Sequence, residues 1–434
     1  MKFPYGICDF REIITKGHFY CDRTDRIHLL ERGKYLLFLR PRRFGKSLLL
    51  SMLANYYDAA REDQFRELFG HLKIGKNPTP LHNQYFILKW DFSCVDPSGS
   101  VQDIKRALHN HINSSIKGFV LYYKDLLPGE VETDPQDAIS SVSSLVSVVR
   151  MTGRPVYLLI DEYDNFANEV MMGVRHEKKD IYEALVYEEG PLKTLFKAVK
   201  SSTSDSLFDR IFITGVSPVV MSDITSGYNI GENIYLKPGF NDLCGFIEKE
   251  IENAVEKIAG ECGFEKQDAE NALSLMRTYY NGYKFAPNAD QPVYNPTMTI
   301  YFMKEFDESC KYPREMLDEN LATDDAKLRY VSQVSGGKQL IAGLVKDGSA
   351  VISGLANRFG IQRMLTDRSR DRKFLASFLY YFGILTAEGE TATGKLALGI
   401  PNLAINGLYI ERIQEMLLPE PTDRDRGISA AEQL

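Results

Sequence analysis

The feature that most constrains this chain is the stretch YLLFLRPRRFGKS at residues 35–47. It opens with five apolar residues, the length of a buried strand, and residues 48–57 have the apolar spacing of a helix. Gly-Lys-Ser therefore lies at a strand-to-helix junction, where backbone amides and the helix N-terminus can hold an anion. We expect strands alternating with helices around a phosphate-binding loop.

The loop departs in one place from the usual GxxxxGK[ST] pattern, because Arg40 occupies the first glycine position. The pattern predicts that Lys46 reaches the β- and γ-phosphates of ATP and that the Ser47 hydroxyl holds Mg²⁺. A chance Gly-Lys-Ser at a helix start is the alternative. The predicted nucleotide-binding residues are Arg42, Arg43, Phe44, Gly45, Lys46, Ser47 and Leu48.

A second apolar run, VYLLI at residues 156–160, ends in two carboxylates. This is the Walker B arrangement, in which Asp161 would bind Mg²⁺ and Glu162 would orient and deprotonate the attacking water. An exposed Asp-Glu pair after a strand is common by itself. Together with the upstream loop, however, it predicts an ATPase.

A strand predicted at residues 210–214 ends in Thr214. A polar residue there can contact the γ-phosphate or the lytic water, so Thr214 is a predicted catalytic residue and Ser217 the second choice. Thr214 could instead cap the next helix. Arg210 is a candidate arginine finger. Arg40, Arg42 and Arg43 could contact phosphate or the nucleotide of a neighbouring molecule, or could form ion pairs with nearby carboxylates. The upstream Tyr5, Ile7 and Phe10 could pack on adenine or belong to the core.

Strands predicted at 85–90 and 234–236 alternate with helices at 101–123, 136–150 and 191–203. Apolar strands alternating with helices indicate a parallel sheet covered on both faces. Later segments are mainly helical, at 242–259, 266–280, 297–308 and 373–382, and strands at 384–386 and 395–401 flank a Gly-containing turn. That ending fits a winged-helix module or another small α+β module.

Composition supports an ordinary globular protein, since 44% of the 434 residues are hydrophobic and 26% are charged. No stretch approaches the roughly 18 apolar residues of a membrane span. The net charge of −7 argues against a generally basic nucleic-acid binder. The six cysteines form no CxxC pair, and the N-terminus does not resemble a secretory signal. We expect buried free thiols in a reducing, cytoplasmic setting.

Several motifs in order resemble the bacterial AAA-ATPase-like family: RPRRFGKSL, LIDEYDNF, ITGVSPV and YNGYKF followed by YNP. The upstream YCDRTDRIHLL is similar to another family element, with Cys21 and Arg23 as departures. In that family arginine replaces the first Walker A glycine, so Arg40 becomes an expected feature. The resemblance covers residues from about 5 to about 410.

The resemblance implies a RecA/AAA-like P-loop NTPase core with a helical lid. The expected domains are the ATPase core (1–240), the lid (241–340), a winged-helix-like module (341–418) and a polar tail (419–434). YNGYKF would close over the nucleotide, with Lys284 as a weak sensor candidate, or would simply pack its aromatic residues around a turn. Family members usually continue into a PD-(D/E)XK nuclease-like domain, which we expect to be absent here through truncation or loss.

The expected function is Mg²⁺-dependent ATP hydrolysis that drives a conformational change in a partner domain, a partner protein or a homo-oligomer. Family association suggests nucleic-acid handling or defence, although the net charge gives this no support. The alternative is a nucleotide-dependent switch or scaffold with little turnover. A third hypothesis is DNA binding through residues 373–401.

Overall fold

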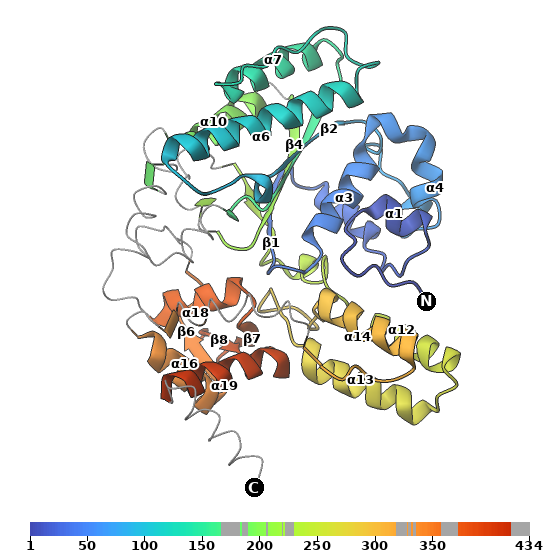
Figure 1. The fold of residues 1–434 in the computed structure, drawn as a ribbon, viewed down its shortest axis with the longest axis vertical. Coiled ribbons are helices and arrows are strands. Elements are labelled where there is room, and N and C mark those ends of the chain that lie inside the picture. The colour runs from blue at the N-terminus through green and yellow to red at the C-terminus, as the bar shows by residue number, and fades with distance from the viewer. Residues whose placement is uncertain are drawn as a thin grey trace. The chain divides into compact units, whose positions relative to one another are not determined.

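The computed structural model describes residues 1–165, 183–184, 190–204, 207–218, 220–221, 230–317, 328, 331–332, 336–356 and 372–417. These residues form two compact units, the first comprising Met1–Cys244 and the second beginning at Gly245 (Figure 1). The predicted tail at 419–434 lies outside the described residues, and the predicted domain boundaries stay predictions.

The first unit is built on a five-stranded sheet with the order β2-β3-β4-β1-β5. Its strands are β1 (Tyr35–Leu39), β2 (Phe86–Asp91), β3 (Val156–Asp161), β4 (Phe208–Gly215) and β5 (Glu232–Asn233). All neighbouring strands are parallel, which confirms the predicted α/β sheet. The fifth strand was expected at 234–236 and this is wrong: the strand precedes that run and is exposed, whereas Ile234 and Tyr235 are buried beyond its end. The apolar residues after Asn233 are apolar because they are buried, and their backbone does not belong to the strand.

Helices cover both faces of this sheet. In Figure 1, α6, α7 and α10 lie on one side of the strands, and α1 and α3 lie on the other. This explains why all six residues of β3 are buried. The helices are α1 (Phe10–Thr15), α2 (Ile27–Leu30), α3 (Lys46–Tyr57), α4 (Phe65–Phe69), α5 (Lys73–Lys76), α6 (Val101–Tyr122), α7 (Ala138–Arg150) and α10 (Pro191–Ser204).

The second unit combines helices with a three-stranded antiparallel sheet of order β6-β8-β7. Its elements are α12 (Glu248–Glu261), α13 (Lys266–Tyr280), α14 (Pro296–Ser309), α16 (Gly337–Asp347), β6 (Ser349–Ile352), α18 (Arg372–Tyr381), β7 (Thr386–Glu390), β8 (Leu396–Gly399) and α19 (Leu403–Leu417).

Two predicted boundaries in this unit are wrong. The helix expected from residue 242 begins at Glu248, and the Glu250 side chain accepts the Ile247 amide hydrogen at 3.0 Å just before that start. The strand expected at 384–386 begins only at Thr386. Ile384 is fully buried in the turn after α18, so its apolar character again reflects burial.

The YNGYKF motif joins the helices of the second unit to its sheet. The Thr386 hydroxyl donates to the Gly282 carbonyl at 2.9 Å, and the Lys284 carbonyl accepts the Ala387 amide hydrogen at 3.2 Å. Gly282 has φ +101°, and a Cβ there would lie 1.9 Å from the Pro401 carbonyl oxygen. These contacts support the structural interpretation of the motif, because its backbone is hydrogen-bonded to the first residues of β7.

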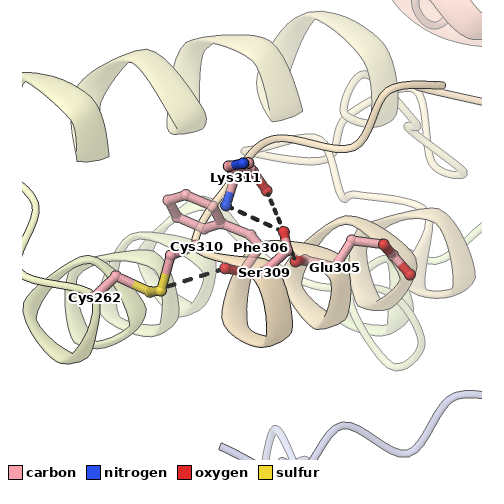
Figure 2. Close-up of a disulfide and its surroundings, with 6 residues drawn as sticks. All are labelled: Cys262, Glu305, Phe306, Ser309, Cys310 and Lys311. Carbon is pink, nitrogen blue, oxygen red and sulfur yellow. Dashed lines mark hydrogen bonds between the residues drawn. A yellow bond between two sulfur atoms is a disulfide. The ribbon is translucent and has the colours of Figure 1, made fainter.

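Cys262 and Cys310 form a disulfide, which corrects the expectation that all six cysteines are free (Figure 2). Cys262 follows α12 and Cys310 follows α14, and the packing of these helices brings the two positions together. Their separation of 48 residues gave no pairing signal in the sequence. Cys8, Cys94 and Cys244 carry free thiols, and the expected burial is confirmed for Cys244 and wrong for the exposed Cys8 and Cys94. Within the described ranges, none of the helices has the length and apolar character needed to cross a bilayer.

Candidate functional site: a phosphate-binding loop beside two strand ends

The carboxyl ends of β1, β4 and β3 lie side by side, because β4 pairs in parallel with both of the others. The loop before α3 follows β1, Asp161 ends β3, and Thr214 lies near the end of β4. Ligands of open parallel sheets bind outside such strand ends. The topology therefore brings the predicted catalytic and metal-binding positions to one edge.

The loop between β1 and α3 turns through left-handed backbone at two residues. Arg43 has φ 68° and Gly45, the N-cap of α3, has φ 86°. A Cβ at Gly45 would meet nothing within 4 Å, so the backbone there faces open space. The amides of Lys46 and Ser47 belong to the first turn of α3, where a helix offers no internal acceptor. This geometry suits a phosphate group.

Arg40 braces the loop from inside the protein. The residue is 1% exposed, and its guanidinium donates to the carbonyl oxygens of Tyr235 at 3.1 Å and Phe240 at 2.7 Å. It also lies over the Phe38 ring, 4.4 Å from the centroid. The Arg40 guanidinium is thus enclosed by backbone carbonyls and has a structural role in place of the phosphate contact that the sequence left open. Arg42 and Arg43 are only half-buried, and phosphate contact stays a prediction for both.

The Lys46 side chain is held at the edge of the loop by backbone carbonyls at the start of the same loop. Its Nζ donates to the carbonyl oxygens of Arg40 and Pro41, each at 3.1 Å, and forms an ion pair with Glu162 Oε1 at 3.4 Å. The lysine side chain is 3% exposed. The nitrogen expected to bind phosphate thus lies beside the carboxylate expected to activate water.

Ser47, Asp161 and Thr214 form one hydrogen-bond chain. The Ser47 hydroxyl donates to Asp161 Oδ2 at 2.7 Å, and the Thr214 hydroxyl donates to Asp161 Oδ1. Asp161 is 1% exposed and Thr214 is fully buried. Thr214 therefore orients the Asp161 carboxylate in this structure, and its direct contact with nucleotide or water stays a prediction.

The same oxygen atoms suit Mg²⁺, which prefers oxygen ligands and usually uses one or two carboxylates with substrate phosphates and water. Ser47 Oγ and Asp161 Oδ2 already lie within hydrogen-bond distance of each other. No group of three or more His, Cys, Asp or Glu side chains with metal-binding spacing occurs among the described residues. The donor set thus fits a cation held jointly by protein and nucleotide.

Glu162 adopts an unusual backbone conformation for a glutamate, with φ 49°. Its amide donates to Asp161 Oδ1 at 3.1 Å, and its side chain is 19% exposed. While Oε1 contacts Lys46, Oε2 finds no hydrogen-bond donor among the described residues. This oxygen is a candidate proton acceptor.

Three other candidates lie in structural positions. Ser217 is 1% exposed and donates its hydroxyl to Asp164 at 3.0 Å. Arg210 lies near the start of β4, away from the carboxyl ends of the strands. Its guanidinium donates to the carbonyls of Glu31 and Gly33, which argues against an arginine finger. Phe10 is fully buried and its ring stacks on Phe69, which supports the core-packing alternative.

Asp164 and Tyr163 are residues of this site that the sequence did not single out. Asp164 is fully buried, and its carboxylate accepts hydrogen bonds from the amides of Val216 and Ser217, which follow β4. Tyr163 donates its hydroxyl to the Ser217 carbonyl at 2.6 Å. Their position directly after Asp161 and Glu162 was the available signal.

A family model described as Predicted AAA-ATPase matches residues 4–225. A curated relative, "Uncharacterized protein in vnfD 5'region" of Azotobacter chroococcum mcd 1, is 25% identical over 319 residues, which cover 70% of this chain and 52% of the relative. The chain thus spans about half the length of that protein.

Solved structures with similarity include the Aeropyrum pernix ORC2 protein in ADPNP–ADP complexes, with a TM-score of 0.39, 11% identity and 92% of each chain covered. Cdc6p of Pyrobaculum aerophilum has a TM-score of 0.30 and 11% identity, over 91% of this chain and 94% of that one. The family model covers about half of the chain, including the loop, Asp161, Glu162 and Thr214. The chain belongs to the Predicted AAA-ATPase family.

Proposed function

We propose that this protein binds ATP with Mg²⁺ and hydrolyses it. The observation that carries the proposal is the hydrogen bond from Ser47 to Asp161, which joins the phosphate-binding loop to the acidic strand end. Lys46 and Glu162 lie at the same edge. A cation site, a phosphate-binding lysine and a potential base therefore occur together.

Each residue of the site would have a separate role in ATP hydrolysis. The loop amides and Lys46 would bind the phosphates, and Ser47 with Asp161 would hold Mg²⁺, which supplies charge neutralisation at the phosphates. Lys46 would exchange Glu162 for phosphate oxygens when ATP binds. Glu162 could then accept the proton of an attacking water, since a carboxylate released from an ion pair regains its acceptor capacity.

The use of the hydrolysis energy is also part of the proposal. ATP turnover would change the conformation of the protein and act on a partner domain, a partner protein or another copy of the chain, in the cytoplasm. Nucleic-acid handling is the less favoured use, because the net charge is −7 and residues 374–381 of α18 are all buried. A helix buried along that length offers little surface to DNA.

A nucleotide-dependent switch with little turnover is the second candidate. The ion pair between Lys46 and Glu162 favours it, because a Lys46 that kept this partner with ATP bound would not be released to contact the phosphates during hydrolysis. The two candidates share ATP binding and differ in the fate of the nucleotide.

The test is steady-state ATP hydrolysis with and without Mg²⁺ in the parent, Lys46→Ala and Glu162→Gln proteins. Lys117→Ala is the matched control, since Lys117 lies exposed on α6 in the same unit. We expect Mg²⁺-dependent turnover that both site substitutions abolish, with ATP retained by Glu162→Gln. Tight binding without turnover in the parent would support the switch, and absence of ATP binding would refute both.

A further inference from the structure

The buried carboxylate of Asp164 connects the turn after β3 to the end of β4. It accepts the Val216 amide hydrogen at 3.1 Å, the Ser217 amide hydrogen at 2.7 Å and the Ser217 hydroxyl hydrogen at 3.0 Å. Tyr163 adds a second connection by donating its hydroxyl to the Ser217 carbonyl. These hydrogen bonds join two segments that are more than fifty residues apart.

The two connected segments carry the reacting positions. Glu162 lies two residues before Asp164, and Thr214 lies two residues before Val216. The Thr214 carbonyl also accepts the Tyr163 amide hydrogen at 3.1 Å. A displacement of either segment would therefore change the separation between the candidate base and the hydroxyl that orients Asp161.

The fit between the segments is close. A Cβ on Gly215 would lie 2.5 Å from Asp164 Oδ1 and 2.5 Å from the Tyr163 ring, so only glycine allows this approach. Glu162, meanwhile, is held at φ 49°, a conformation that a non-glycine residue keeps only when its surroundings fix it. The bonds made by Asp164 are part of those surroundings.

Burying the Asp164 carboxylate costs free energy, which indicates a role beyond occupying space in the core. Burial raises the pKa of this carboxyl, the nearby charge of Glu162 raises it further, and the hydrogen bonds from Ser217 and Val216 lower it. Among the described residues no cation forms an ion pair with Asp164. An apolar side chain would avoid this desolvation but could not bind two amides in fixed directions.

We propose that Asp164 is a positioning residue for ATP hydrolysis, which holds Glu162 and Thr214 in the arrangement needed for the chemical step. The inference rests on the proposed ATPase function. Asp164 lies on a different element from the phosphate-binding loop, so its loss should affect turnover and leave nucleotide binding intact. Small misplacements of catalytic groups can reduce a rate by about 100-fold.

The experiment compares the parent with Asp164→Ala, Asp164→Asn and Ser217→Ala, measuring kcat, the ATP dissociation constant and the thermal unfolding midpoint. Asp58→Asn is the matched control. Asp58 is also a buried carboxylate in the first unit, it accepts two tyrosine hydroxyls at 2.8 Å, and it lies beside the start of β2. Its loss should lower stability without changing kcat.

We expect Asp164→Ala to reduce kcat by about 100-fold with an ATP dissociation constant close to that of the parent. Asp164→Asn, whose amide oxygen can still bind Ser217, and Ser217→Ala should lie between the two. If the Asp164 variants lose stability but keep the parent kcat, as Asp58→Asn should, the inference is wrong while the ATPase proposal stands. If the parent hydrolyses no ATP, both fail together.

Discussion

Ser47 and Asp161 are 114 residues apart in the chain, and their side chains are joined by a 2.7 Å hydrogen bond. The bond connects the first turn of α3 to the last residue of β3. Strand β4 lies between β1 and β3 in the sheet, and its Thr214 hydroxyl donates to the same carboxylate. Three segments thus meet at one acidic group.

Arg40 should be needed for stability at the position where the usual loop has glycine. Arg40→Gly restores the common pattern, yet it should lower the free energy of unfolding by about 3 kcal/mol, because buried carbonyls lose a charged donor. Chemical denaturation measures this. Arg42→Ala, at a half-buried neighbour, is the control and should change stability by less than about 0.5 kcal/mol. Equal effects would contradict the bracing role.

Thr214 should act through Asp161. Thr214→Val removes the donor and should raise the Mg²⁺ concentration needed for half-maximal hydrolysis by about 10- to 100-fold, because groups that orient a metal ligand have effects of that size. Thr214→Ser, which keeps the hydroxyl, should resemble the parent. A lower kcat with an unchanged Mg²⁺ requirement would instead point to direct contact with nucleotide or water.

His111 should make stability depend on pH. Its Nε2 accepts the Asp91 amide hydrogen at 3.1 Å, which requires the neutral ring at that nitrogen. Burial lowers the pKa of His111, and the Asp91 charge opposes this. The folded pKa is therefore below the unfolded value of about 6.5. The stabilisation is complete above that value and is lost as pH falls below it towards the folded pKa.

The measurement for His111 is the free energy of unfolding between pH 7.5 and pH 5.5. His111→Gln, which cannot bind a proton, should show a smaller loss over this range than the parent. His71→Gln, at an exposed position, should follow the parent. A parent and a His111→Gln protein with the same pH dependence would show that this ring contributes nothing to it.

The Cys262–Cys310 disulfide should stabilise the second unit. Its reduction, or Cys262→Ser, should lower the free energy of unfolding by about 2–4 kcal/mol, as expected for a bond that closes a loop of this length. Cys94→Ser, which removes an exposed free thiol, is the control. Mass spectrometry with and without reductant tests the bond itself, and six reactive thiols in the unreduced protein would refute it.

The sequence alone was enough to predict the central strands of the main sheet and several of the residues that lie together at its carboxyl edge. The runs at 35–39 and 156–160 predicted two central strands, because a strand covered on both faces must be apolar at nearly every position. The edge strand β5 was predicted two residues too late, because the prediction followed the apolar residues. Glu232 and Asn233 are exposed, so hydrophobicity could not mark their strand.

Residue types and spacing also predicted a site at Lys46, Ser47, Asp161, Glu162 and Thr214, because phosphate and Mg²⁺ chemistry restricts which side chains can follow such strands. Their partners were decided by tertiary structure. Asp164 meets Ser217, and Cys262 meets Cys310, only after strands and helices have packed. Arg40 meets the Phe240 carbonyl in the same way. Contacts between residues 48 to 200 positions apart leave no local pattern, because side-chain periodicity reports which face is buried and not what lies against it.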